Sequence, residues 1–102
     1  MEDYLKRQTR CNSAVINQVI RSGTSISANI AESLNAESKL DFIHKLSIAL
    51  KEADETKSWL VNIKACYPVH QVAFQTMIED IDEIRFMLIA SIKTAKGINN
   101  KE

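Results

Sequence analysis

Residues 39–66 read KLDFIHKLSIALKEADETKSWLVNIKAC and carry the strongest structural pattern in the chain. Apolar and small residues recur there at alternating spacings of four and three, namely Phe42, Leu46, Ala49, Ala53, Thr56, Leu60 and Ile63. This spacing is typical of one face of a long helix. The residues on the opposite side should face water, namely His44, Lys51 and Ser58. Further apolar residues widen the face on both flanks, which favours a bundle helix with more than one neighbour.

Signals for helix boundaries lie on both sides of this segment. Ser38 stands three residues before Asp41, a variant of the capping box that satisfies free amides of a first helical turn. At the other end, Pro68 disfavours the helical conformation in the residue before it. The helix should therefore begin just after Ser38 and end near Cys66.

A second helix is predicted over residues 69–96, and Gly97 marks its end. Its apolar residues form one stripe that Arg85 interrupts, namely Phe74, Ile78, Ile81, Leu88, Ile92 and Ala95. Phe86 and Ile89 lie nearer the opposite, acidic face of this helix. They are either scattered exposed apolar residues, which are common in soluble proteins, or an oligomer interface.

The segment 13–34, preceded by a weak break at Asn12 and Ser13, is the least regular of the three. Helical propensity alone would make residues 22–25 a loop. Apolar and small residues nevertheless keep a spacing of three and four through the segment, namely Ile16, Ile20, Gly23, Ser27, Ile30 and Leu34. Either one helix runs through, and its packing motif of Gly23, Ser27 and Ile30 lets another helix approach closely, or the helix breaks at Gly23.

The composition agrees with a few long helices in one domain over residues 1–102. Of 102 residues, 45% are hydrophobic and 25% are charged, as in ordinary folded proteins. Two glycines and one proline are too few for the turns of a β-sandwich or barrel. No apolar run approaches the ~18 residues of a membrane span. The first residues are acidic and do not resemble a secretion signal, so we expect a cytoplasmic protein without membrane contact.

Residues suited to catalysis or metal binding are sparse. The two histidines, His44 and His70, lack the clustered partners of a metal site, so neither a metal nor a cofactor is expected. Neither a nucleophile elbow nor a phosphate-binding glycine loop is present. The sequence therefore predicts a protein that is not an enzyme.

The charges balance overall but are not evenly distributed. The chain has 13 basic and 13 acidic residues. The first 30 residues hold four cationic side chains, namely Lys6, Arg7, Arg10 and Arg21, against the two acids Glu2 and Asp3. These cations are either an ordinary solvated helix face or a nucleic-acid-binding surface.

Three motifs carry a family resemblance. The segments RSGTSISANIAE (21–32), DFIHKLSIA (41–49) and KEADETKSWL (51–60) resemble the four-helix-bundle family of 23S rRNA intervening-sequence proteins. That family includes relatives of the accessory variability determinant of diversity-generating retroelements. The resemblance implies an antiparallel up-and-down helical bundle, a ring-like homopentamer, no catalytic residues, and a continuous helix through Gly23. Only about a dozen residues precede Asn12, so the first helix of the four should be short or truncated.

The resemblance also bears on function. For the retroelement relatives it implies binding to nucleic acid and to a reverse transcriptase through a basic surface. We therefore expect an all-α, oligomeric and non-enzymatic protein that acts by binding, with structured RNA or DNA as the leading candidate. The alternative is a protein–protein scaffold or adaptor with no nucleic-acid role.

Overall fold

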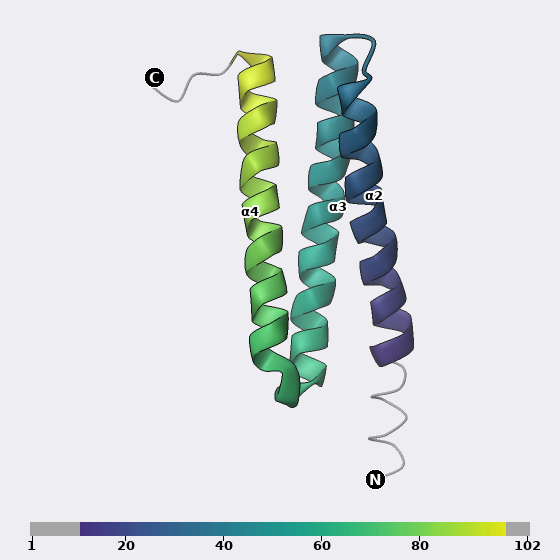
Figure 1. Cartoon of the computed structure of the whole chain (residues 1–102), viewed down its shortest axis with the longest axis vertical. Helices are drawn as coiled ribbons and strands as arrows, with labels where there is room; N and C mark the ends of the chain where they lie inside the picture. The colour runs from purple at the N-terminus through teal and green to yellow at the C-terminus, as the bar shows by residue number, and fades with distance from the viewer. Residues whose placement is uncertain (1–10, 98–102) are drawn as a thin grey trace.

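The computed structural model describes residues 11–97, and over them the chain consists of helices joined by short turns, without strands (Figure 1). Three long helices run up, down and up: α2 (Ile16–Leu34), α3 (Lys39–Cys66) and α4 (Gln71–Lys96). The all-α, antiparallel prediction is confirmed. The described part of the chain has three long helices rather than the four of a complete four-helix bundle. The first helix, predicted to be short or truncated, lies outside the described residues.

The three predicted helix boundaries are confirmed, and each has a local cause. The Ser38 hydroxyl accepts a hydrogen bond of 3.0 Å from the backbone N–H of Asp41, which caps the start of α3. Tyr67 leaves the helical conformation before Pro68, which opens a short 3-10 turn, η2 (Pro68–His70). Gly97 ends α4 in the left-handed conformation at φ 79°, which glycine adopts without a steric penalty.

The start of α2 differs from the prediction. The weak break expected at Asn12 and Ser13 is wrong, because a π-helical turn, η1 (Cys11–Val15), leads directly into α2. The continuous alternative holds at Gly23, since α2 runs through it without interruption. Each π turn takes more residues than an α turn, so it changes the direction of the side chains along a helix.

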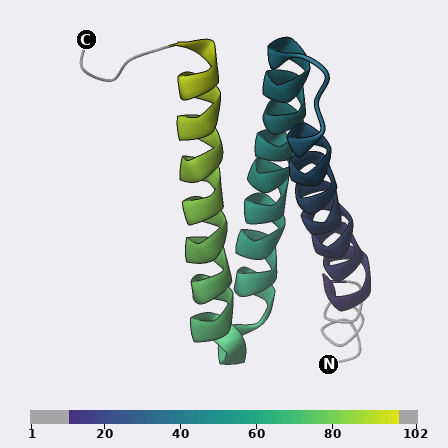
Figure 2. The same cartoon turned by 45° about the horizontal axis from the view of Figure 1, so that its top comes forward.

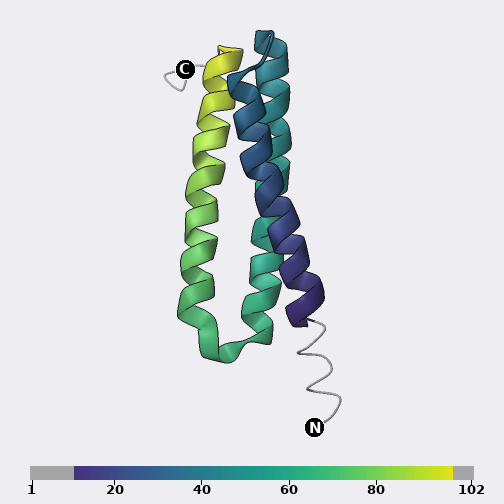
Figure 3. The ribbon, with the colours of Figure 1, turned by 45° about the vertical axis from the view of Figure 1, so that its right-hand side comes forward.

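Helix α3 lies at the centre of the arrangement and contacts both α2 and α4 (Figure 2). Helix α2 is inclined to α3 rather than parallel to it (Figure 3). The predicted face of α3 is confirmed, since its buried residues are Leu46, Ala49, Ala53, Thr56, Leu60 and Ile63. The residues predicted to lie opposite, His44, Lys51 and Ser58, are exposed.

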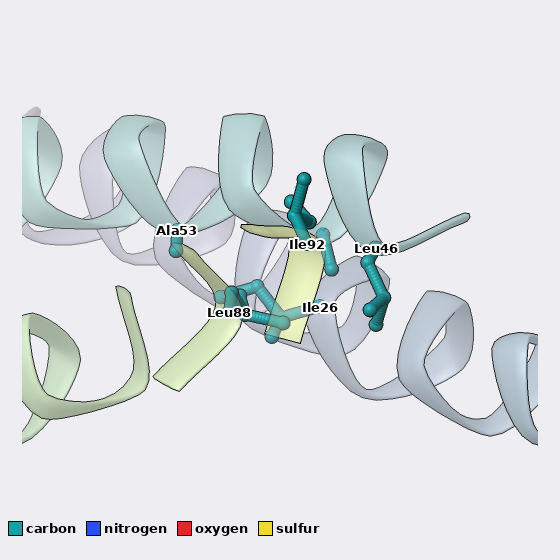
Figure 4. Packing of buried hydrophobic residues seen from close by; sticks show 6 residues of the cluster. Ile26, Leu46, Ala53, Leu88 and Ile92 are labelled. Carbon is teal, nitrogen blue, oxygen red and sulfur yellow. The ribbon is translucent and has the colours of Figure 1, made fainter. Parts of the chain in front are cut away.

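The hydrophobic core takes residues from all three helices (Figure 4). Ile26 comes from α2, and Leu88 and Ile92 come from α4. Three residues of α3 complete this cluster, namely Leu46, Ala49 and Ala53. Ala49 and Ala53 are fully buried, so their small side chains allow the neighbouring helices to approach α3 closely. This core positions α2 and α4 on either side of the same α3 face.

Candidate protein-binding groove

An open apolar groove of 380 Å³ lies over the α3 face, with α2 forming one wall and α4 the other. Its lining is aliphatic, aromatic or hydroxylated, namely Ile26, Ser27, Ile30, Ser33, Leu34, Phe42, Leu46, Ile84, Met87, Leu88 and Ser91. No charged side chain is among these lining residues. An uncharged, apolar concavity suits a hydrophobic ligand surface and offers no cationic side chain to a phosphate.

The two edges of the groove expose large apolar side chains. On the α2 side, Leu34 is 77% exposed, and on the α4 side Met87 is 62% exposed. Removing apolar surface from water is worth about 25 cal/mol per Å², so covering these side chains would be favourable. The groove is therefore a surface of the described chain on which a partner could bury apolar side chains.

The side of α2 that packs on α3 is polar. Ser22, Asn29 and Ser33 are all buried there, and Ile26 is the one apolar residue among the buried positions of α2. Thr56 donates a hydrogen bond of 2.6 Å to the Ser22 hydroxyl across the two helices. Ser22 donates in turn to the Gln18 carbonyl at 2.9 Å. These hydroxyls satisfy one another and the backbone, so the burial leaves none of them without a partner.

The predicted helix-packing motif lies beside this contact rather than in it. A Cβ added at Gly23 would meet nothing within 4 Å, and Ser27 is exposed on the groove wall. Ile30 is half-buried and packs against the core. No helix of the described chain therefore crosses at Gly23 and Ser27. The contact with α3 uses Ser22 and Ser33 instead.

A sequence signal for this contact did exist. Ser22, Ile26, Asn29 and Ser33 repeat the spacing of four, three and four that marks the buried face of α3. A search for apolar residues alone does not detect this face, because three of these four residues are polar. Small residues at helical spacing point to close packing even where they are not apolar.

Arg21, the one predicted nucleic-acid-binding residue that the structure describes, is held by acids of α3. Its guanidinium contacts Glu52 at 3.5 Å and Glu55 at 3.3 Å, and it donates to the Gln18 amide oxygen at 3.1 Å. These contacts balance its charge, so Arg21 would have to give them up to bind a phosphate. Lys6, Arg7 and Arg10 lie outside the described residues.

On the other side of α3, ion pairs join it to α4. Arg85 contacts Asp54 of α3 and also Asp82, one turn away on α4. Lys57 reaches Asp82 at 2.9 Å. The hydrogen bond from Lys57 lowers the pKa of Asp82, and the bonds to Asp54 and Asp82 raise the pKa of Arg85. Arg85 interrupts the apolar stripe of α4 because it lies at the edge of the contact between α3 and α4, where it pairs with these two acids.

The residues predicted as an oligomer interface lie away from the groove lining. Phe86 is 64% exposed, and Ile89 is half-buried. Phe86 precedes Met87, yet successive helical residues point about 100° apart. Only Met87 of this pair lines the groove. The molecule thus presents two separate apolar surfaces on α4.

Two further features bear on the kind of site. Among residues 11–97, no three His, Cys, Asp or Glu side chains come together in a group that could hold a metal ion. In the same part of the chain, none of the helices is both long enough and apolar enough to span a membrane.

Comparisons with known proteins identify the family. The chain is similar to a crystal structure of a protein of unknown function from the S23 ribosomal protein family of Bacteroides thetaiotaomicron VPI-5482. The two are 38% identical, the match covers 89% of each chain, and the TM-score is 0.75. No curated protein matches the sequence. The model of the 23S rRNA-intervening sequence protein family matches residues 4–90, so the chain belongs to that family.

Proposed function

We propose that this protein works by binding rather than by catalysis, and that its groove receives a helix of a protein. The observation that carries this proposal is the uncharged lining between α2 and α4, with Leu34 and Met87 exposed at its edges. An amphipathic helix placed in such a groove buries its apolar face without burying a charge. This supports the scaffold or adaptor function over an active site.

The cationic side chains between the helices also favour protein binding. Arg21 pairs with Glu52 and Glu55, and Lys45 pairs with Glu32 at 3.4 Å. Neutralised pairs of this kind attract phosphates weakly, because nucleic-acid affinity comes from cations that replace condensed counterions. The surface around the groove is thus suited to proteins more than to RNA or DNA.

Nucleic-acid binding is the second candidate, and the N-terminal charges favour it. Lys6, Arg7 and Arg10 fall within ten residues and outnumber the acids Glu2 and Asp3. A basic surface of this kind would bind structured RNA or DNA, together with a reverse transcriptase if the protein acts like its retroelement relatives. In that case the predicted homo-oligomer, a pentamer in the family resemblance, would multiply the charge at one site.

Two titrations of the full chain separate these candidates. The first follows the fluorescence anisotropy of a labelled synthetic amphipathic helix rich in alanine and leucine. We expect saturable binding that Met87→Glu abolishes and that salt changes little. The second uses a labelled RNA hairpin at low and high salt. Binding to the hairpin that falls steeply with salt, and that glutamine at Lys6, Arg7, Arg10 and Arg21 removes, would support the second candidate instead. If the synthetic helix does not bind at all, the proposed function is wrong.

A further inference from the structure

We infer that the groove between α2 and α4 binds a basic amphipathic helix of another protein, whose cationic side chains lie on Asp80 and Glu83 of α4. The inference rests on the proposed function, because it names the chemistry of the partner that the same groove receives. An apolar stripe of that helix fills the groove, and lysine or arginine at one end of the stripe meets the two acids. The groove provides the burial, and the acids select the charge of the partner.

The two acids border the groove on its α4 wall. Side chains four residues apart lie one above the other on a helix. Asp80 is four residues before Ile84, and Glu83 is four residues before Met87. Ile84 and Met87 both line the groove. Helix α4 runs upward in Figure 1, so the acids lie one turn below this lining, at the lower end of the groove.

Neither acid has a cationic partner among residues 11–97, and both are exposed. Five other acids of the described chain do form ion pairs, namely Glu32, Glu52, Asp54, Glu55 and Asp82. The lower end of the groove therefore carries negative charge that the described helices do not offset. A cation of a partner would offset it.

The α2 wall provides no free cation at this level. Helices α2 and α4 run in the same direction, and Ile26 shares the core with Leu88 (Figure 1). Asp80 is eight residues before Leu88, so it lies at about the level of Gln18 on α2, by the common rise per residue. The apolar side chains of α2 around that level are exposed or half-buried, namely Ile16, Val19 and Ile20. Arg21 is the nearest cation of α2, and Glu52 and Glu55 hold it.

Two exposed methionines lie on the same side of α4 as the acids. Met87 lines the groove, and Met77 is seven residues before Ile84, which places it on the same face two turns below. The flexible thioether side chain of methionine adapts to apolar partners of different shape. Asp80 and Glu83 lie between these methionines in the sequence. Adaptable apolar contacts beside a fixed negative charge suit a helix that is selected by its charge more than by the shape of its side chains.

The same charge disfavours a nucleic acid in the groove. Binding to RNA or DNA requires cations that replace the counterions of the phosphates. Asp80 and Glu83 repel phosphates, and the groove lining contains no cation that would compensate. A positively charged protein helix is therefore the occupant that this surface fits.

The test compares three labelled synthetic helices that share one apolar stripe of alanine and leucine. At one end of the stripe they carry two lysines, two glutamines or two glutamates. Fluorescence anisotropy measures their binding to the full chain. At low salt the lysine helix should bind about fivefold more tightly than the glutamine helix, because ion pairs at an exposed edge contribute modestly. The glutamate helix should bind most weakly, and high salt should reduce these differences.

Substitutions of the two acids should change this order in a defined way. Asp80→Lys combined with Glu83→Lys should reverse the order, so that the glutamate helix binds most tightly. Asp80→Asn combined with Glu83→Gln should make the three affinities equal. The matched control is Glu79→Lys, since Glu79 is exposed and points about 100° away from Asp80. This variant should keep the order of the parent. Circular dichroism should show unchanged helix content in all variants, because the substituted residues are exposed.

Four results would overturn the inference. If the three helices bind the parent equally, the proposed function stands and the inference fails. If none of them binds, both fail. Release of the glutamine helix by an RNA hairpin would place a nucleic acid in the groove instead. An order that appears only after glutamine replaces Lys6, Arg7 and Arg10 would place the chain's own cations on Asp80 and Glu83.

Discussion

The two sides of α3 hold their neighbours by different means. Toward α2, the contact consists mainly of small and polar side chains, with Ile26 as its one buried apolar residue. Ser22 is fully buried there and hydrogen-bonded to Thr56. Toward α4, it consists of branched aliphatic side chains such as Leu88 and Ile92. Ion pairs lie at the edges of both contacts. Helix α3 therefore contacts α2 through small side chains that let the helices approach closely. It contacts α4 through large side chains that fill the space between the helices.

This difference teaches where each contact is vulnerable. A contact between small residues has no room for a larger side chain, but loses little when a hydroxyl is removed. The contact between α3 and α4 is formed by large side chains. It is sensitive to their truncation, because a shortened side chain leaves a cavity. Substitutions that enlarge one side and reduce the other should therefore reveal the asymmetry directly.

Leu88→Ala should give the largest effect. Leu88 is 5% exposed and belongs to the shared core, so its truncation creates a cavity between α3 and α4. The expected loss is about 2–5 kcal/mol of the free energy of unfolding, measured by urea denaturation. The control is Met87→Ala on the same helix, where the side chain is 62% exposed and the loss should be small. Equal losses for the two variants would contradict the core assignment.

Ser22→Leu should give the next largest effect, from the opposite cause. Ser22 is 0% exposed against α3, so leucine there overfills the contact at a cost of roughly 1–3 kcal/mol. Ser22→Ala keeps the size and loses one hydrogen bond, so it should cost only about 1 kcal/mol. Both values come from denaturation melts of the purified variants. If leucine were tolerated better than alanine, the close contact between α2 and α3 would not exist.

The sequence predicted the α3 side of both contacts and missed the α2 side. The α3 positions were found because six residues at heptad spacing are buried as expected. On α2, an apolar stripe is present but does not face α3. Ile16 is 37%, Ile20 60% and Leu34 77% exposed, while three of the four buried positions are polar. Apolar periodicity gives the spacing of residues on a helix face, but it does not show which helix that face contacts. On α2 it therefore indicates the exposed apolar stripe and not the polar face that packs on α3.

The candidate site shows the same limit. Ser27 and Ile30 were predicted as packing residues, and they do lie on one wall of the groove. The other wall, with Ile84 and Met87, required the relative placement of α2 and α4, which no single-helix pattern contains. The positive charge of Arg21 alone suggests a contact with phosphate, and only the fold shows that Glu52 and Glu55 lie beside it.

The structure predicts that Gly23→Ala stabilises the protein. The sequence alone left two opposed contributions, a gain in helical propensity and a clash with a crossing helix. Because an added Cβ meets nothing within 4 Å, the clash is absent within the described chain. The substitution should raise the free energy of unfolding by about 1 kcal/mol, the helical preference of alanine over glycine. The measurement is urea denaturation of the variant beside the parent. A destabilised Gly23→Ala variant would show that a helix does cross at this position.

The smallest expected effect concerns the ion pairs on the α4 side, and it depends on pH. Lys57 lowers the folded-state pKa of Asp82 below its ordinary value of 3.8, with Arg85 adding to the same shift. A carboxylate whose pKa is lower in the folded state stabilises the fold fully above the unfolded pKa. That contribution is lost as the pH falls through the lower folded-state pKa. The raised pKa of Arg85 adds no pH dependence in this range, because arginine stays protonated in both states.

Asp82→Asn should therefore flatten the decline of stability below about pH 4, as measured by urea denaturation at a series of pH values. Lys57→Met should flatten it in part, because Arg85 still pairs with Asp82. The double variant should match Asp82→Asn, since both partners of the Lys57–Asp82 pair are then absent. Ser22→Ala removes no charged group, so it should leave the decline unchanged. An acid-induced decline that survives in both Asp82→Asn and Lys57→Met would show that the ion pairs of Asp82 do not cause it.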